Sequence, residues 1–251
     1  MNTKNTCALI LAAGKGTRMG SSVTKVLNTI LDKSIIEYVV DAVDLECIDR
    51  IGIVVSPHNI KHINKVLKNR VDYIIQKEPR GTGHAVLAAE KWLNKFEGSV
   101  VVLVGDAPFI KKTTILKLVE KQQTNNSAVC FLSTIFKEPP PWGRVIRDKS
   151  NNVIKIVEEF DATVDEKKIK EVSSSHYCFN WNKLKNALHN IGNTNRQGEY
   201  YLPDAINLFA LNGYDIQTIT TTNTLLGYGI NTLEDLKFVK DEMAKGNFKH
   251  E

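Results

Sequence analysis

Short apolar runs alternate with amphipathic segments through the first half of the chain. The runs are rich in Val, Ile and Leu and are bounded by polar or turn-forming residues, which indicates buried strands. These strands are expected at residues 7–13, 50–56, 71–76, 99–106 and 127–134. Helical periodicity in the intervening segments predicts helices at residues 34–45, 59–69, 83–93 and 113–123. The alternation predicts an α/β fold with a Rossmann-like, doubly wound, mostly parallel sheet.

The second half of the chain has a less regular pattern. A proline run near the start of residues 137–148 excludes a helix there. Strands are expected at residues 152–160 and 171–181, and helices at residues 200–213 and 232–246. No linker or internal repeat separates the two halves, so the second half is expected to extend the same sheet and to add a substrate-side subdomain.

Length and composition are compatible with a single domain over residues 1–251. The chain is 42% hydrophobic and 24% charged, so it can build a core without disulfides or a structural metal. Its four cysteines are scattered and form no CxxC pair, which argues against a zinc ribbon or a thioredoxin-type site. No apolar window is long enough to span a bilayer and no secretory leader is present, so we expect a cytoplasmic protein with no membrane partner.

The net charge of +5 is modest and the lysines are spread along the chain. No basic block interleaved with aromatic residues is present, so nucleic acid is not an expected partner. A small polyanionic substrate suits the same charge. For most of the lysines, a solvated surface is the simpler explanation.

The loop "GKGTRMG" follows the first predicted strand and favours phosphate binding. It lacks the GxxxxGK[ST] spacing of a P-loop. It also lacks the third glycine of a dinucleotide loop, because Met19 stands at that position. A turn with Gly14 and Gly16 can still bring bare backbone N–H groups close to phosphate oxygens. The alternative is a glycine-rich turn with solvated cations.

Cations and a carboxylate add to this loop. Lys15, Arg18 and Lys25 together suit a triphosphate better than a monophosphate. Asp106 follows a buried strand, where ligands bind such sheets, and one carboxylate together with substrate phosphates is a common way to hold Mg²⁺. Asp106 could equally cap the next loop. Gln76 also stands at a strand end, so these residues converge on one edge of the sheet.

Segments over nearly the whole chain resemble the nucleotidyltransferases that activate sugar 1-phosphates. The similarity is greatest to the uridyltransferase domain of the N-acetylglucosamine-1-phosphate uridyltransferases. The matching segments, in the family's order and with similar spacing, are "LAAGKGTRM…KVL", "QKEPRGTGHAVLAA", "VLVGDAPFI", "GRVIRDKSNNVIKIVEEFDAT", "NRQGEYYLPDAI" and "GINTLEDL". This resemblance implies a nucleotide-binding half at about residues 1–135 and a sugar-side half at about residues 136–251.

The resemblance also implies a role for individual residues. The catalytic residues it implies are Arg18, Lys25 and Asp106. The implied nucleotide-binding residues are Leu11, Ala12, Ala13, Gly14, Lys25, Gln76, Gly81 and Thr82. The implied sugar-binding residues are Gly143, Glu158 and Ser173, and the implied Mg²⁺ ligands are Asp106 and Asn231.

Three positions depart from the family pattern. Thr24 replaces a proline before the second cation, which removes the fixed φ of that loop. Ser173, Ser174 and Ser175 stand where the family has Asn-Thr-Gly, and Val104 stands where a tyrosine is common. The last two departures fall on the sugar side, so the nucleotide side matches the family better than the sugar side does.

The implied reaction joins a nucleoside triphosphate, with UTP favoured, to N-acetylglucosamine 1-phosphate or a related sugar 1-phosphate. Mg²⁺ assists and pyrophosphate leaves. The alternatives are a cytidylyl- or other nucleotidyltransferase for a different phosphorylated sugar or alcohol, and a catalytically weak nucleotide-binding regulator. The hexapeptide-repeat β-helix of the bifunctional members has no counterpart in the sequence, so acetyl transfer is not expected. We expect a monomer or a small homo-oligomer.

Three histidines deserve comment because of their positions. His58 and His62 are four residues apart on a predicted helix, but no HExxH pattern surrounds them, which favours a solvated helix face. His84 lies near the implied nucleotide site, where a structural role is favoured over direct contact.

Overall fold

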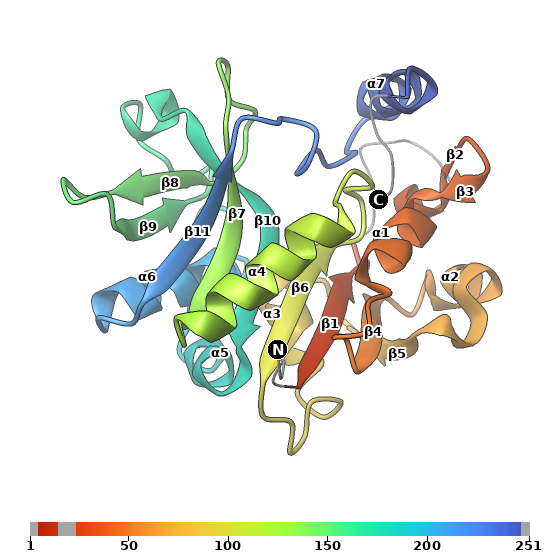
Figure 1. Ribbon diagram of the computed structural model, residues 1–251, viewed down its shortest axis with the longest axis horizontal. Coiled ribbons are helices and arrows are strands. Elements are labelled where there is room, and N and C mark those ends of the chain that lie inside the picture. Colours follow the sequence, from red (N-terminus) through yellow and green to blue (C-terminus); the bar gives the residue numbers. More distant parts are fainter. Residues whose placement is uncertain (1–4, 15–23, 247–251) are drawn as a thin grey trace.

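The computed structural model describes residues 5–14 and 24–246. Within these ranges, nine strands form one sheet, and the order β11-β7-β10-β6-β1-β4-β5 is completed by β8 and β9, which branch from β10 (Figure 1). The strands are β1 (Thr6–Leu11), β2 (Thr29–Ile30), β3 (Lys33–Ser34), β4 (Arg50–Val55), β5 (Asp72–Ile75), β6 (Ser99–Val104), β7 (Val129–Ile135), β8 (Arg144–Arg147), β9 (Val153–Val157), β10 (Glu171–Asn180) and β11 (Ile216–Thr221). The α-helices are α1 (Ile35–Val43), α2 (Ile60–Leu67), α3 (Thr82–Leu87), α4 (Lys112–Thr124), α5 (Trp181–Leu188), α6 (Pro203–Leu211) and α7 (Leu233–Ala244). The 3-10 turns are η2 (Lys25–Leu27), η3 (Lys68–Arg70) and η4 (Glu166–Lys168).

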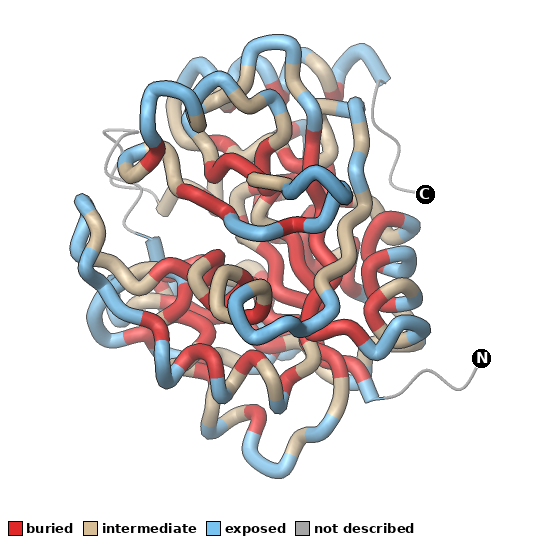
Figure 2. Tube along the Cα trace, turned by 90° about the vertical axis from the view of Figure 1, so that its left-hand side faces the viewer, coloured by how far each residue is buried: buried red, intermediate tan, exposed pale blue. Residues whose placement is uncertain are grey.

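Helices cover both faces of the sheet, which confirms the doubly wound α/β prediction. Side chains alternate across a strand, so Cys7 and Leu9 of β1 lie in one core while Ala8 and Ile10 lie in the other. The first core also receives α3, α5 and α6, and the second receives α1, α2 and α4. Figure 2 shows the buried strands as a continuous layer between more exposed helices.

Strand β10 corrects the simple picture of an all-parallel first half. β4, β1 and β6 are parallel neighbours, but β10 lies antiparallel between β6 and β7. A strand from the second half is therefore inserted into the first half of the sheet. Local apolar pattern could not reveal this pairing, because it depends on contacts between residues far apart in the sequence.

Several elements differ from their predictions, and the short strands β2, β3 and β8 were not predicted. The helix predicted at 83–93 is the short α3, because turns replace it after Leu87. Helix α5 was not predicted either, and only its first residue, Trp181, falls in the predicted strand; Asn180 caps the helix by accepting a hydrogen bond from the Lys183 backbone N–H. Strand β11 was not predicted, since its residues are mostly half-exposed at the sheet edge and lack a buried apolar run.

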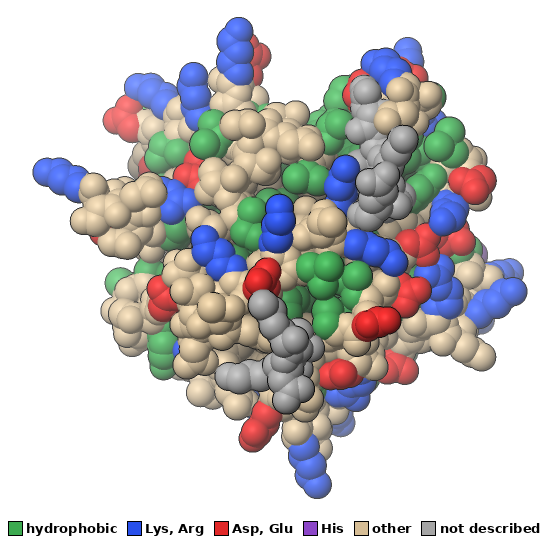
Figure 3. Space-filling model, viewed as in Figure 1, with side chains coloured by type: hydrophobic (Ala, Val, Ile, Leu, Met, Phe, Trp, Pro, Cys, Tyr) green, Lys and Arg blue, Asp and Glu red, His purple; other side chains and the backbone are tan. Residues whose placement is uncertain are grey.

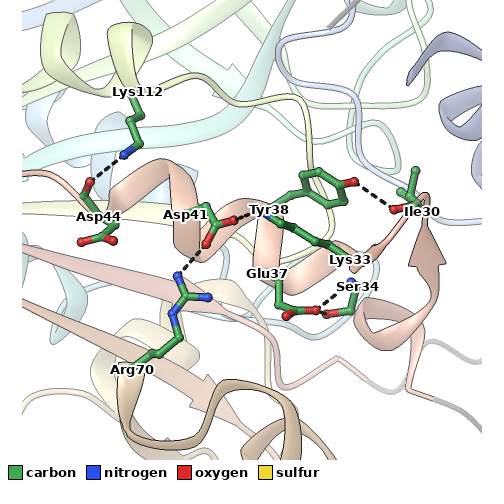
Figure 4. Close-up of polar contacts among 9 residues, drawn as sticks. All are labelled: Ile30, Lys33, Ser34, Glu37, Tyr38, Asp41, Asp44, Arg70 and Lys112. Carbon is green, nitrogen blue, oxygen red and sulfur yellow. Dashed lines mark hydrogen bonds and ion pairs between the residues drawn. The ribbon is translucent and has the colours of Figure 1, made fainter. Parts of the chain in front are cut away.

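Helix α1 anchors the segment that carries Lys25. Ser34 and Glu37 form a capping box at its start. The Tyr38 hydroxyl donates a hydrogen bond of 2.9 Å to the Ile30 carbonyl, and Asp41 pairs with Arg70 (Figure 4). The Tyr38 contact ties the β2–β3 hairpin to α1, and the Ile35 N–H ties α1 to the carbonyl of Asn28, the residue after η2.

Helix α7 packs beside α1 and fixes the segment that precedes it. Val239 and Met243 of α7 join Ile30 and Tyr38 in a small separate core. Thr232 and Asp235 form a capping box at the start of α7, and the Asp235 carboxylate also accepts from the backbone N–H of Asn231. No helix among the described residues is both long and apolar enough to cross a membrane.

Candidate active site

A cavity of about 230 Å³ opens at the carboxyl ends of β1 and β5. Every residue predicted to bind nucleotide lines it. These residues are Leu11, Ala12, Ala13, Gly14, Lys25, Gln76, Gly81 and Thr82. Further lining residues, which sequence reasoning did not assign to the nucleotide side, are Val26, Pro79, Ala85, Val104, Asp106 and Glu199. We call this space the first cavity.

The floor of the first cavity is rigid backbone. The Ala12 N–H donates to the Val54 carbonyl at 2.8 Å, and the Gly105 N–H donates to the Leu11 carbonyl at 2.9 Å. The side-chain amide of buried Asn59 donates to the Ala12 carbonyl at 2.8 Å. The strand end that leads to Gly14 therefore has little freedom.

One wall of the first cavity comes from the second half of the chain. The Gly83 N–H donates to the Tyr200 carbonyl at 2.7 Å, and the Tyr200 N–H donates to the Arg80 carbonyl at 2.9 Å. Gly81 has φ +105°, and a Cβ there would lie 2.5 Å from the Tyr200 carbonyl oxygen, so this docking requires glycine. Glu199 lines the first cavity, and the helix predicted at residues 200–213 begins only at Pro203.

Lys25, Asp106 and Asn231 meet at one point. The Lys25 ammonium forms an ion pair with the Asp106 carboxylate and donates a hydrogen bond of 3.1 Å to the Asn231 side-chain oxygen. The Ile230 N–H donates to the Asp106 carbonyl at 2.9 Å, which ties the end of β6 to the segment before α7. Residues that are 206 positions apart in sequence, Lys25 and Asn231, thus form one polar cluster.

The cluster also suits a divalent cation. The oxygens of Asp106 and Asn231 already converge on a positive charge, the Lys25 ammonium. Carboxylate and amide oxygens are ligands that Mg²⁺ accepts, and Mg²⁺ commonly completes its shell with substrate phosphates and water. Among residues 5–14 and 24–246, no group of three or more His, Cys, Asp or Glu side chains could hold a metal, so further ligands would have to come from elsewhere.

A second cavity of about 180 Å³ lies on the other side of Asp106. It is lined by the predicted sugar residues Gly143, Glu158 and Ser173, together with Asn231. Trp142 also lines this second cavity and packs edge-on against Phe136 and Tyr228. The two cavities share Val104 and Asp106, so the polar cluster lies at the boundary between them.

Glu158 has an unusual protonation equilibrium for a carboxylic acid. Burial, assisted by the nearby charges of Asp204, Asp161 and Glu199 and opposed by Arg144, raises its pKa to about 7. A carboxyl in this setting carries its proton over much of the neutral range. In that state it can both donate and accept hydrogen bonds with a hydroxyl-rich ligand.

The serine run adopts a distorted strand. The Ser173 hydroxyl lies 3.1 Å from the Tyr177 hydroxyl, and the Ser174 hydroxyl lies 2.8 Å from the Thr134 hydroxyl. The pairing of β10 with β7 shifts register between Ser173 and Tyr177. Ser175 has φ +56°, a left-handed conformation that glycine adopts more readily.

His176 is a buried residue near the site that sequence reasoning missed. It is fully buried, and neither ring nitrogen has a hydrogen-bond partner among the described residues. Burial lowers its pKa to about 4, and the Asp106 charge and the Leu226 backbone offset only part of this effect. Its position within a predicted strand was the only available signal, and it did not distinguish a buried ring from an exposed one.

Some predicted positions lie outside the described residues. These are Lys15, Gly16, Arg18 and Met19. Elsewhere, His58 and His62 are exposed as expected, but only His62 lies on α2, because the helix begins at Ile60 and His58 is in the turn before it. On the face of the molecule that carries α4 and α1, Lys and Arg side chains are interspersed with Asp and Glu (Figure 3).

Comparison with known proteins agrees with this geometry. The family model described as "MobA-like NTP transferase domain" matches residues 8–172. The "Bifunctional protein GlmU" of Caldicellulosiruptor saccharolyticus is 38% identical over 242 residues, which cover 96% of this chain and 52% of that protein. The proteins of the same name from Thermoanaerobacter pseudethanolicus and Shouchella clausii are 46% identical over 200 residues and 40% identical over 238 residues. These matches cover 80% and 95% of this chain, and 43% and 52% of the respective relatives.

The chain thus spans about half the length of the curated relatives it matches. The similarity extends over most of the chain, and the family match alone covers the strands that carry Gly14, Gln76 and Asp106. The resemblance inferred from sequence motifs is confirmed, as is the prediction of a nucleotidyltransferase. The chain belongs to the MobA-like NTP transferase family.

Proposed function

We propose that this domain joins a nucleoside triphosphate, preferably UTP, to a sugar 1-phosphate and releases pyrophosphate, with Mg²⁺ as the metal. The observation that carries the proposal is the cluster of Lys25, Asp106 and Asn231 at the boundary between two cavities. The residues predicted for the nucleotide line one cavity, and those predicted for the sugar line the other. A transfer between two substrates needs such a boundary.

The chemistry requires no general base. An oxygen of the sugar phosphate, already ionised at neutral pH, attacks the α-phosphorus of the triphosphate. The bond from that phosphorus to the bridging oxygen breaks, and the electron pair leaves with pyrophosphate. Catalysis is then positioning and stabilisation of developing charge. Lys25 offsets that charge, and we propose that Arg18 does so as well.

Mg²⁺, held by Asp106 and Asn231, would neutralise phosphate charge and orient the reacting groups. The chain's own contribution is to aim both side-chain oxygens at one point through the β6 end and the capped start of α7. Ala13 and Gly14 would contact the base and ribose, and Gln76, Gly81 and Thr82 would read the pyrimidine. Glu158 and Ser173 would contact the sugar.

The favoured sugar is N-acetylglucosamine 1-phosphate or a related sugar 1-phosphate, on the strength of the resemblance to GlmU proteins. The serine run and Val104 line the second cavity and depart from the family pattern, which supports a related sugar as well. The alternatives are a cytidylyltransferase and a weakly catalytic regulator. We further propose a cytoplasmic monomer or small homo-oligomer whose two halves bind the two substrates, with residues 199–202 crossing to the nucleotide side.

A pyrophosphate-release assay tests the proposal. Each of four nucleoside triphosphates is paired with a panel of sugar 1-phosphates, with Mg²⁺ and with a chelator. We expect release with UTP and at least one sugar 1-phosphate, and loss of release in the chelator. Asp106→Ala should reduce turnover by about 10²–10³-fold. Asp165→Ala, at an exposed aspartate, is the matched control.

The outcomes of this assay separate the alternatives. Release with CTP alone would favour the cytidylyltransferase, and tight UTP binding without any release would favour the regulator. A folded Asp106→Ala variant with normal turnover would show that the proposed metal and transfer site is wrong.

A further inference from the structure

His84 is the only imidazole in the described part of the chain that contacts a residue predicted to read the base. Its Nδ1 atom lies 2.9 Å from the side-chain nitrogen of Gln76. Gln76 is buried, stands just after β5 and lines the first cavity. His84 lies on α3, half-buried behind Gln76.

The orientation of the Gln76 amide follows from its second contact. The same nitrogen lies 3.3 Å from the Gly81 carbonyl oxygen. A carbonyl can only accept a hydrogen bond, so the Gln76 group that faces it must be the NH₂. The NH₂ then also donates to Nδ1 of His84, which must present a lone pair there. His84 is therefore a neutral imidazole with no proton on Nδ1.

The surroundings of His84 favour that neutral form. Burial lowers its pKa, the Arg80 charge lowers it further, and Glu78 opposes them. On its other side, His84 shares a cavity with Tyr200 and with His189, which follows α5. The ring of Tyr200 lies 6.4 Å from the imidazole and carries the Arg80 guanidinium over its own face at 5.2 Å.

We infer that His84 is a positioning residue that makes Gln76 present its carbonyl oxygen, rather than its NH₂, to the nucleobase. With the NH₂ donating to Gly81 and His84, the Gln76 oxygen has no donor among the described residues, and Gln76 lines the first cavity. An oxygen at this place accepts from the ring N–H of uracil. Cytosine has a lone pair on the corresponding nitrogen and is disfavoured. This inference rests on the proposed nucleotide site. It assigns the choice between uracil and cytosine to His84, which does not line the first cavity.

The test compares two substitutions that differ in a single property. In His84→Asn the side-chain oxygen can replace Nδ1 as an acceptor, whereas His84→Leu has no acceptor. Equilibrium dissociation constants for UTP and CTP are measured at pH 7.5, together with the thermal melting temperature. We expect the wild type to bind UTP more tightly than CTP. The ratio of the two dissociation constants should stay within about threefold of the wild-type ratio in His84→Asn. It should fall about tenfold in His84→Leu, because the Gln76 amide is then free to turn over.

The pH dependence gives a second readout that a packing role would not produce. Protonation would put a proton on Nδ1 and force the Gln76 amide to turn. Because the pKa of His84 is lowered, the wild type should lose UTP preference only as the pH falls below the range of an ordinary histidine. His84→Asn should keep its preference over the same range. The charged and titratable groups that face His84, which are Arg80, Glu78, Tyr200 and His189, are present in both proteins.

Each outcome decides the inference. An equal loss of UTP preference in His84→Asn and His84→Leu would mean that His84 only packs against Gln76, and would overturn the inference. An unchanged preference in His84→Leu would also overturn it, as would the absence of any preference in the wild type. Because the readout is binding, it is separate from pyrophosphate release. A protein that discriminates UTP from CTP but releases no pyrophosphate would refute the proposed reaction and leave the role of His84 standing.

Discussion

The two cavities that meet at Asp106 are built in different ways. The first is framed by backbone, with hydrogen bonds between Ala12 and Val54 and between Gly83 and Tyr200 holding its floor and wall. The second is framed by side chains, including a half-buried glutamic acid and a distorted strand with a serine at positive φ. Every predicted nucleotide-binding residue lines the first cavity, whereas the serine run that departs from the family pattern lines the second. Val104, a further departure, lines both.

This difference suggests how the two substrates are distinguished. Backbone hydrogen bonds fix the shape of the first cavity, and this suits a substrate that is the same in many reactions, such as a nucleotide. Side chains can be exchanged without disturbing the sheet, which suits a sugar that varies between enzymes. We therefore expect substitutions in the first cavity to affect binding by changing its shape. Substitutions in the second cavity should affect binding by changing hydrogen bonding and charge, which depend on pH.

The largest effect is expected where the cavities meet, because Lys25 pairs with Asp106, which lines both cavities. Lys25→Met should lower kcat by at least about 10²-fold with either substrate varied, since it removes a positive charge placed beside the transferred phosphate. Steady-state kinetics with each substrate in turn measure this. Lys168→Met, at an exposed lysine, should retain full turnover. An effect confined to the KM of one substrate would place Lys25 in a single cavity and weaken the comparison.

The next effect tests the backbone construction of the first cavity. Gly81→Ala would combine an unfavourable φ with a clash against the Tyr200 backbone, which should destabilise the fold by about 2–4 kcal/mol. The KM for UTP should rise while the KM for the sugar phosphate changes little. Gly14→Ala is the control for stability, because a Cβ at Gly14 would meet no atom of the described residues within 4 Å. Chemical denaturation of both variants provides the measurement, and equal stability would contradict the steric account.

The sugar side should respond to pH in a range where the nucleotide side does not. Because the pKa of Glu158 is raised to about 7, its carboxyl is mostly protonated at pH 6 and charged at pH 8. A negative charge here repels the incoming sugar phosphate, so the KM for that substrate should rise several-fold from pH 6 to pH 8. Glu158→Gln should remove this rise, after the same correction for ionisation of the substrate. The KM for UTP should stay flat.

The same shift makes a prediction for stability. A carboxyl with a raised folded-state pKa gives most stability below about pH 4.5, where both states are protonated, and this contribution is lost as the pH rises toward about 7. Denaturation curves of wild type and Glu158→Gln between these limits should diverge in that direction. Parallel curves would mean that burial does not shift this carboxyl.

Sequence reasoning succeeded where local pattern and strand direction determine position. Asp106 follows a buried strand and so was expected at the ligand edge of the sheet, and it lies there. The nucleotide residues gathered in one cavity were assigned by family resemblance, and their roles remain predictions. The docking of Tyr200 on Gly81 and the insertion of β10 depend on long-range pairing, which no local pattern contains.

Side-chain details on the sugar side were equally out of reach. The departure of the serine run from the family pattern was visible in the sequence, but the positive φ of Ser175 and the burial of His176 were not. Both follow from how β10 fits between its neighbours. The sequence therefore indicates that the sugar side differs, and the structure shows where the difference is accommodated.

The smallest expected effect concerns the backbone strain at Ser175 in β10. Ser175 has φ +56°, where a residue with a Cβ loses about 1–2 kcal/mol relative to its preferred conformation. Glycine removes this strain but has a more flexible unfolded chain, which offsets roughly 0.5–1 kcal/mol. Ser175→Gly should therefore stabilise the protein by about 0.5–1 kcal/mol in chemical denaturation.

The comparison with another serine makes this result specific to the strand. Ser150 lies in an exposed turn without positive φ, so Ser150→Gly gains nothing from relief of strain and should cost a few tenths of a kcal/mol. If Ser175→Gly is stabilised while the KM for UTP is unchanged, the strain belongs to the sugar side alone. If it is destabilised like Ser150→Gly, then β10 holds Ser175 through contacts that outweigh its backbone, and the second cavity is as rigid as the first.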